Sequence, residues 1–171
     1  MLDVERLSIH FEDRGRREEA VKNVSFQLAD GKILGIVGES GSGKTMTALT
    51  IAGLKKQRAV IDGGSVCLDG VDLLTLDDAQ MRSVQGARIG MIFQEPMSAL
   101  NPTMKIGKQL EEVLVLHAKL SKEERRNKVF AAMEDVELEN PRELYEKYPH
   151  ELSGGMRQRA MLAAAIVCRP K

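Results

Sequence analysis

The sequence has few of the features that mark secreted, membrane-spanning or nucleic-acid-binding proteins. Its two cysteines, Cys67 and Cys168, cannot build a disulfide framework, and they match no metal-ligand spacing. No apolar run approaches the roughly 18 residues that a membrane-spanning helix needs. Basic residues are not in excess, since 25 lysines and arginines balance 25 aspartates and glutamates, which disfavours a general nucleic-acid-binding protein. The acidic N-terminus lacks the apolar core of a secretion signal, so we expect a soluble, cytosolic chain.

The composition is that of an ordinary globular protein. With 171 residues, 43% of them hydrophobic and 29% charged, the chain is expected to form one domain or a domain and a half. We find no internal repeat and no linker. Apolar residues alternate in two N-terminal stretches, which predicts an antiparallel pair of half-buried strands joined by a solvated loop over residues 12–19. The alternating residues are Leu7, Ile9 and Phe11, followed by Val24, Phe26 and Leu28.

Further strands and helices are predicted along the rest of the chain. The continuous apolar runs 33–37 and 88–93 read as strands buried on both faces. Residues 61–74 read as short strands, with turns at 62–64 and 69–70. Caps and breakers indicate helices, among them one opened by a capping box of Ser121 and Glu124 and one capped by Ser153. The predicted helices cover residues 44–54, 77–84, 106–120, 122–138, 141–148 and 154–168.

A glycine-rich loop between the predicted strand 33–37 and the helix after it fits the pattern G-x-x-x-x-G-K-[ST]. The glycines let several backbone N–H groups point into one concavity, which with the helix N-terminus makes an anion site. Lys44 is expected to reach the β- and γ-phosphates of a nucleotide and Thr45 to bind Mg²⁺. The alternative is a glycine-rich turn that happens to precede Lys-Thr, and the strand-loop-helix context disfavours it. The loop consists of Gly38, Glu39, Ser40, Gly41, Ser42, Gly43, Lys44 and Thr45.

The run LSGGMRQR at residues 152–159 is a second candidate phosphate site. Ser153 and the amides after it form another helix N-terminus that can hold an anion. A chain with one complete phosphate cradle rarely needs a second for the same nucleotide, so this one is expected to act on nucleotide held by a partner. An ordinary N-capped helix with two permissive glycines is an equally weighted alternative when the run is taken alone.

These motifs together resemble an ATP-binding subunit of an ABC transporter. The loop at 38–45 resembles Walker A, FQEP at 93–96 a Q-loop, and LSGGMRQR the signature motif. The sequence segments GESGSGKT, MIFQEPMSALNP and YPHELSGGMRQR are similar to those of the dipeptide, oligopeptide and nickel importer ATPases. The resemblance covers essentially the whole chain. It implies an α/β fold: a RecA-like P-loop NTPase core, an N-terminal antiparallel β subdomain and an inserted helical subdomain.

The resemblance also implies residue roles and partners. Phe11 would stack on adenine, unless it is an ordinary core aromatic of its strand, and Gln94 would contact Mg²⁺ or the attacking water. Ser153, Gly154 and Gly155 would close over the ATP of a second, identical or different, ATP-binding subunit. The other implied partners are transmembrane permease subunits and, indirectly, a solute-binding protein, with no nucleic acid. The implied location is the cytoplasmic face of the membrane. The chain would form one truncated nucleotide-binding domain with three parts: the β subdomain and P-loop core (1–93), the Q-loop and helical subdomain with the signature motif (94–157), and a helix that leads back to the core (158–171).

A helix of the permease is expected to dock near residues 97–106. One hypothesis places Met97, Leu100 and Met104 in an apolar groove for that helix. The equally weighted alternative is that they form part of a packed subdomain core.

The resembled family also has groups that this sequence lacks. A Walker B aspartate, the glutamate after it and a switch histidine would follow the signature, yet residues 154–171 contain no Asp or Glu. We therefore expect the sequence to stop short of its catalytic carboxylates, to hydrolyse little ATP alone and to be marginally stable. The other functions considered are a soluble ABC ATPase outside transport, a nucleotide-binding piece without catalysis, and a P-loop kinase or GTPase, in which LSGGMRQR would have no role.

Overall fold

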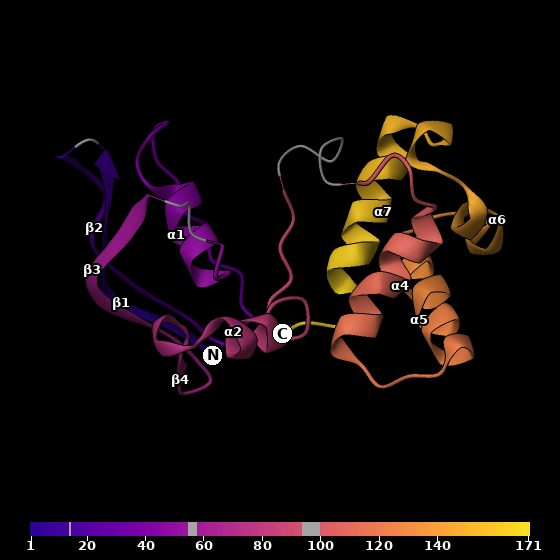
Figure 1. Ribbon diagram of the computed structural model, residues 1–171, viewed down its shortest axis with the longest axis horizontal. Coiled ribbons are helices and arrows are strands. Elements are labelled where there is room, and N and C mark those ends of the chain that lie inside the picture. Colours follow the sequence, from indigo (N-terminus) through magenta and orange to yellow (C-terminus); the bar gives the residue numbers. More distant parts are fainter. Residues whose placement is uncertain (14, 55–57, 94–99) are drawn as a thin grey trace. The chain divides into compact units, whose positions relative to one another are not determined.

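The computed structural model describes residues 1–13, 15–54, 58–93 and 100–171. The chain divides into two compact units, Met1–Arg82 and Ser83–Lys171. The first unit contains the sheet, and the second contains most of the helices (Figure 1). No helix in the described part of the chain is long and apolar enough to cross a bilayer.

A four-stranded antiparallel sheet in the order β2-β1-β3-β4 builds the first unit. The strands are β1 (Leu2–Asp13), β2 (Arg16–Leu28), β3 (Ala59–Leu68) and β4 (Val71–Asp72). The predicted alternation holds on β1, where Leu7 and Ile9 are buried between charged or polar neighbours. Full burial of such side chains contributes about 1.5–3 kcal/mol each to the stability of the fold, so these residues stabilise the packing of the sheet.

Two predicted loops are wrong because the strands run through them. Residues 12–13 and 16–19 belong to strands β1 and β2, with Asp13 opposite Arg16, instead of a solvated loop. The glycines at 63 and 64 lie inside β3 and make no turn. Gly64 has a φ of +96°, and a Cβ there would overlap the backbone of Glu5 and Arg6, so this glycine lets β3 approach β1 closely.

The helices of the first unit include α1 (Lys44–Ile51), which follows the glycine-rich loop and contacts β2. The 3₁₀ turn η1 (Leu73–Thr75) is capped by the Asp72 carboxylate, which accepts a hydrogen bond from Leu74 N. Helix α2 (Asp78–Val84) confirms the helix predicted over 77–84.

The second unit packs its helices around one apolar core. They are α4 (Ile106–His117), α5 (Lys122–Asp135), α6 (Pro141–Glu146), the 3₁₀ turn η2 (Pro149–Glu151) and α7 (Gly154–Ile166). Both predicted caps are confirmed: Ser121 and Glu124 form a reciprocal capping box, and the Ser153 hydroxyl accepts a hydrogen bond from Met156 N. Leu100 is buried in this core, which favours the packed-core alternative over the apolar docking groove for this residue; Met97 lies outside the described residues.

The two buried strands predicted at 33–37 and 88–93 are absent as strands. Residues 33–37 are exposed, with Ile33 99% and Val37 92% accessible. In the second run only a single bridge, Gln85 to Ile89, is present, and Ile92 and Phe93 are exposed. A strand needs neighbours to satisfy its N–H and C=O groups, and no described strand pairs with either run.

Candidate nucleotide site

The glycine-rich loop leads into the N-terminus of α1 through a left-handed glycine. Gly43 is the N-cap of α1 with a φ of +86°, a conformation that other residues adopt only with strain. A Cβ at this position would overlap the carbonyl oxygen of Ala20 and crowd Val21 on β2. Only glycine therefore allows the loop to lie this close to the sheet, and this close approach fixes where α1 begins.

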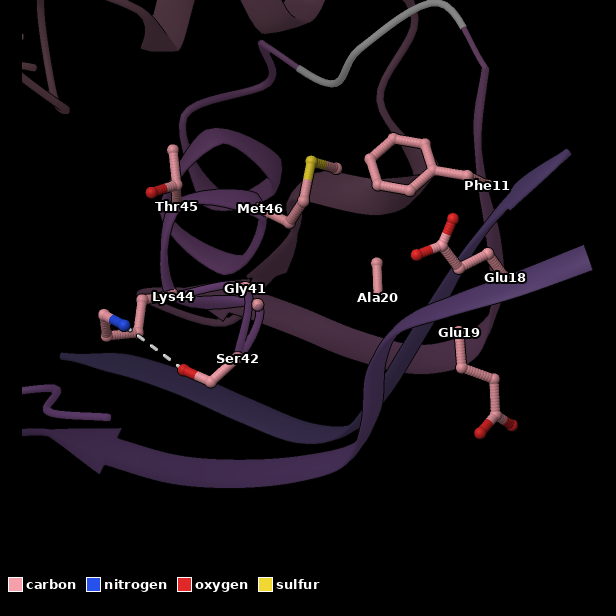
Figure 2. Close-up of a pocket in the computed structure, with 10 residues that line it drawn as sticks. Phe11, Glu18, Glu19, Ala20, Gly41, Ser42, Lys44, Thr45 and Met46 are labelled. Carbon is pink, nitrogen blue, oxygen red and sulfur yellow. Dashed lines mark hydrogen bonds between the residues drawn. The ribbon is translucent and has the colours of Figure 1, made fainter. Parts of the chain in front are cut away.

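Lys44 holds the loop together from inside. Its ammonium group donates hydrogen bonds to the carbonyl oxygens of Gly38, at 2.7 Å, and Glu39, at 2.5 Å. A third bond runs to the Ser42 hydroxyl at 3.2 Å (Figure 2). The two carbonyl oxygens thus accept hydrogen bonds from the lysine, whose positive charge can also attract an anion.

A cavity of about 260 Å³ lies between this loop and the β1–β2 hairpin. Phe11 from β1 lines it together with Lys44, Thr45 and the buried Met46 at the start of α1 (Figure 2). Phe11 is only partly buried, unlike Leu7 and Ile9 on the same strand. The cavity therefore brings an accessible aromatic face and a cationic loop together, which favours a ligand contact over a core role for Phe11.

Two acidic residues of the hairpin also line the cavity and were missed by the sequence reasoning. Glu18 and Glu19 were assigned to a solvated loop, yet both belong to β2, and Glu18 pairs with Phe11 across the hairpin. Placing the hairpin turn at residue 15 would have predicted this register, because Asp13 then pairs with Arg16 and the partners follow in order.

The signature residues lie at an exposed helix N-terminus in the second unit. Ser153, Gly154 and Gly155 are all exposed at the start of α7. Two arginines fix this helix to its neighbours: Arg157 Nε donates to the Pro149 carbonyl oxygen at 2.7 Å, and Arg159 Nη1 donates to that of Glu137 at 2.5 Å. The helix dipole at this end favours a negative charge nearby.

The remaining predicted residue, Gln94, lies outside the described residues. Within the described ranges, no group of three or more His, Cys, Asp or Glu side chains is arranged to hold a metal ion. Thr45 is exposed in the first turn of α1 and offers a hydroxyl oxygen, a ligand type that suits Mg²⁺.

The glycine-rich loop leads into the N-terminus of α1 and carries the lysine and threonine of the P-loop pattern, while residues 33–37, which precede it, form no strand in this structure. The ABC transporter family model matches residues 21–171, so the chain belongs to that family. The chain is 43% identical over 171 residues to the dipeptide transport ATP-binding protein DppD of Haemophilus influenzae, covering 100% of this chain and 52% of that protein. It is also 43% identical to the oligopeptide transport ATP-binding protein OppD of Bacillus subtilis, covering 100% and 48% respectively.

A solved structure supports the fold. The dimeric structure of a post-hydrolysis state of an ATP-binding cassette bound to ADP and Pi superimposes with a TM-score of 0.85 at 28% identity. The match covers 99% of this chain and 71% of that one. The chain spans about half the length of the curated relatives it matches.

Proposed function

We propose that this chain is the ATP-binding, energy-coupling part of an ABC importer ATPase. The observation that carries the proposal is the cavity shared by Phe11 and the Lys44 loop, which joins an aromatic face to a cation at a helix N-terminus. Adenine would stack on Phe11, and the triphosphate would lie against Lys44 and the amides of residues 39–45. The same groups fit Mg²⁺·ATP, in which the metal would neutralise phosphate charge beside the Thr45 hydroxyl.

We further propose that ATP is shared between two such chains. The exposed signature residues Ser153, Gly154 and Gly155 would contact the phosphates of a nucleotide held by a second ATP-binding subunit, whether identical or different. Support comes from their exposure at an anion-binding helix end and from the dimeric state named for the similar cassette. Gln94 would contact the metal or the attacking water. The same proposal divides the nucleotide-binding domain into the parts 1–93, 94–157 and 158–171.

Hydrolysis is assigned to the whole protein. Residues 154–171 carry no carboxylate that could position water or hold a second metal contact. This chain by itself is thus proposed to bind nucleotide without turning it over.

The transported solute is proposed to be a peptide. The relatives named as dipeptide and oligopeptide transport proteins support a peptide as the solute. Nickel as the solute rests only on the similarity of the sequence motifs. Permease subunits would hold the protein at the cytoplasmic face of the membrane, and a solute-binding protein would act with them. No observation favours the nucleic-acid or kinase alternatives.

The test is thermal unfolding with and without ATP·Mg²⁺. A ligand at about 100 times its dissociation constant stabilises the folded state by about 2.7 kcal/mol, which moves the melting temperature by several degrees. We expect this shift in the wild type and in Lys32→Ala, which removes an exposed lysine outside the loop, and no shift in Lys44→Ala. An equal shift in Lys44→Ala would contradict the proposal.

A further inference from the structure

The two glutamates of the hairpin differ in where their side chains extend. Glu18 extends toward Phe11 and the cavity, whereas Glu19, next along β2, extends to the other side of the strand (Figure 2). This follows from the alternation of side chains along a strand. Glu18 and Phe11 are register partners on neighbouring strands, so the carboxylate lies beside the aromatic ring.

Their interactions differ as well. Glu19 forms an ion pair with Lys22 at 3.3 Å. In the described part of the chain, no hydrogen bond or ion pair engages the Glu18 carboxylate. It therefore keeps all its acceptor positions for a ligand, and an ionised carboxylate accepts hydrogen bonds without donating any.

The cavity is thus chemically polarised. Lys44 and Ser42 of the loop lie on one side, and Phe11 with Glu18 lies on the other (Figure 2). A carboxylate at the cationic end would repel a triphosphate, but at the aromatic end it meets the edge of the stacked base. Stacking alone accepts any base, because every base has a π face, so discrimination must come from the edge.

We propose that Glu18 selects the nucleobase by accepting a hydrogen bond from the exocyclic 6-amino group of adenine. This inference rests on the proposed nucleotide site and adds a specificity-determining residue to it. Adenine presents an N–H₂ donor at C6, where guanine presents an oxygen acceptor that a carboxylate repels in the same pose. Glu18 therefore favours ATP over a purine nucleotide that lacks the amino group.

The test compares three nucleotides in matched variants. Dissociation constants for ATP, GTP and purine riboside triphosphate, which lacks the 6-amino group, are measured with Mg²⁺ on wild type, Glu18→Ala and Glu19→Ala. The quantity of interest is the ratio between nucleotides, since loss of a negative charge near the phosphates affects all of them alike. Circular dichroism checks that the exposed substitutions leave the fold intact.

We expect wild type and Glu19→Ala to bind ATP about tenfold more tightly than purine riboside triphosphate, the lower end of the effect of one hydrogen bond to a charged acceptor. In Glu18→Ala the ratio should fall to near one. An unchanged ratio in Glu18→Ala would overturn the inference while leaving the nucleotide site standing. A preference for GTP that depends on Glu18 would also overturn it. If wild type bound none of the three, the proposed function would fail as well.

Discussion

Gly107 on α4 lies directly against the ring of Tyr145 on α6, with no room for a side chain between them. A Cβ at Gly107 would overlap the Cγ, Cδ2 and Cε2 atoms of that ring. The ring is held on its other sides, edge-on to Phe130 with centroids 5.7 Å apart and under the Arg126 guanidinium at 4.8 Å. The glycine therefore sets how closely α4 and α6 pack.

Gly107→Ala should destabilise the second unit by about 1–3 kcal/mol, since the buried ring cannot move aside without disturbing its other contacts. Urea unfolding followed by circular dichroism measures this loss. Gly154→Ala is the matched control, because a Cβ there meets nothing within 4 Å and alanine favours the helix. An unchanged midpoint for Gly107→Ala would contradict the packing described.

A second prediction concerns the ion pair beneath the same ring. The Lys108 ammonium lies 2.8 Å from the carboxylate of the buried Glu111. Burial raises the pKa of Glu111, but the Lys108 ammonium and the Tyr145 hydroxyl outweigh it, so the pKa lies below its ordinary value of 4.5. A lowered pKa means that this carboxylate stabilises the fold above pH 4.5 and loses that effect as the pH falls through the lowered value.

Lys108→Met leaves the Glu111 carboxylate buried without its cation. We expect a loss of about 1–2 kcal/mol at pH 7, below the 3–5 kcal/mol of fully buried pairs because Lys108 is half exposed. The loss should shrink as the pH falls, because without Lys108 the pKa of Glu111 is higher than in the wild type and the buried carboxylate is neutralised at a higher pH. Lys147→Met, which breaks the exposed pair with Glu143, serves as control and should change little. A loss that does not change with pH would count against the charge effect.

A third prediction concerns Gly43. Gly43→Ala adds both the strain of a positive φ and an overlap with the Ala20 carbonyl oxygen. It should cost about 2–3 kcal/mol and abolish the melting shift given by ATP. Gly41→Ala has the same kind of φ, +85°, but open space around it, and should cost about 1 kcal/mol. Equal losses in the two variants would rule out the close approach to β2 as the cause.

The exposed apolar run 33–37 predicts self-association. The double variant Ile33→Lys, Val37→Lys should scatter less light at high concentration than wild type, because exposed apolar chain drives aggregation. Its free energy of unfolding, measured in urea, should stay within about 0.5 kcal/mol of that of the wild type, since neither side chain is buried. Leu7→Ala, in the core of the sheet, should instead lose about 2–5 kcal/mol. A large loss in the double variant would show that the run is packed in solution.

Local patterns predicted most of the elements. Alternation located β1 and β2, and the caps Ser121 and Ser153 located the starts of α5 and α7, because each of these signals depends on neighbouring residues only. The strands predicted at 33–37 and 88–93 were wrong because their formation depends on distant residues. Their apolar character predicts burial, but burial of a strand depends on which other segments lie beside it, and no sequence window contains that information.

The candidate site could be predicted only in part, because some of its residues are close in sequence and others are brought together by strand pairing. The loop residues up to Thr45 follow from one contiguous motif. Glu18 and Met46 line the same cavity, but Glu18 was missed because its place depends on the cross-strand register of the hairpin. That part of the register follows from the turn at residue 15, which alternation of apolar residues does not locate.

The sheet of the first unit is built wholly from residues 2–72, and the helical core of the second from residues 100–167. Each unit therefore draws its core from one continuous stretch of chain. As the ribosome releases the protein from the N-terminus onward, the sheet has all its strands before the first residue of α4 is made. The hairpin side of the cavity and the loop that faces it have then both been synthesised before translation reaches α7.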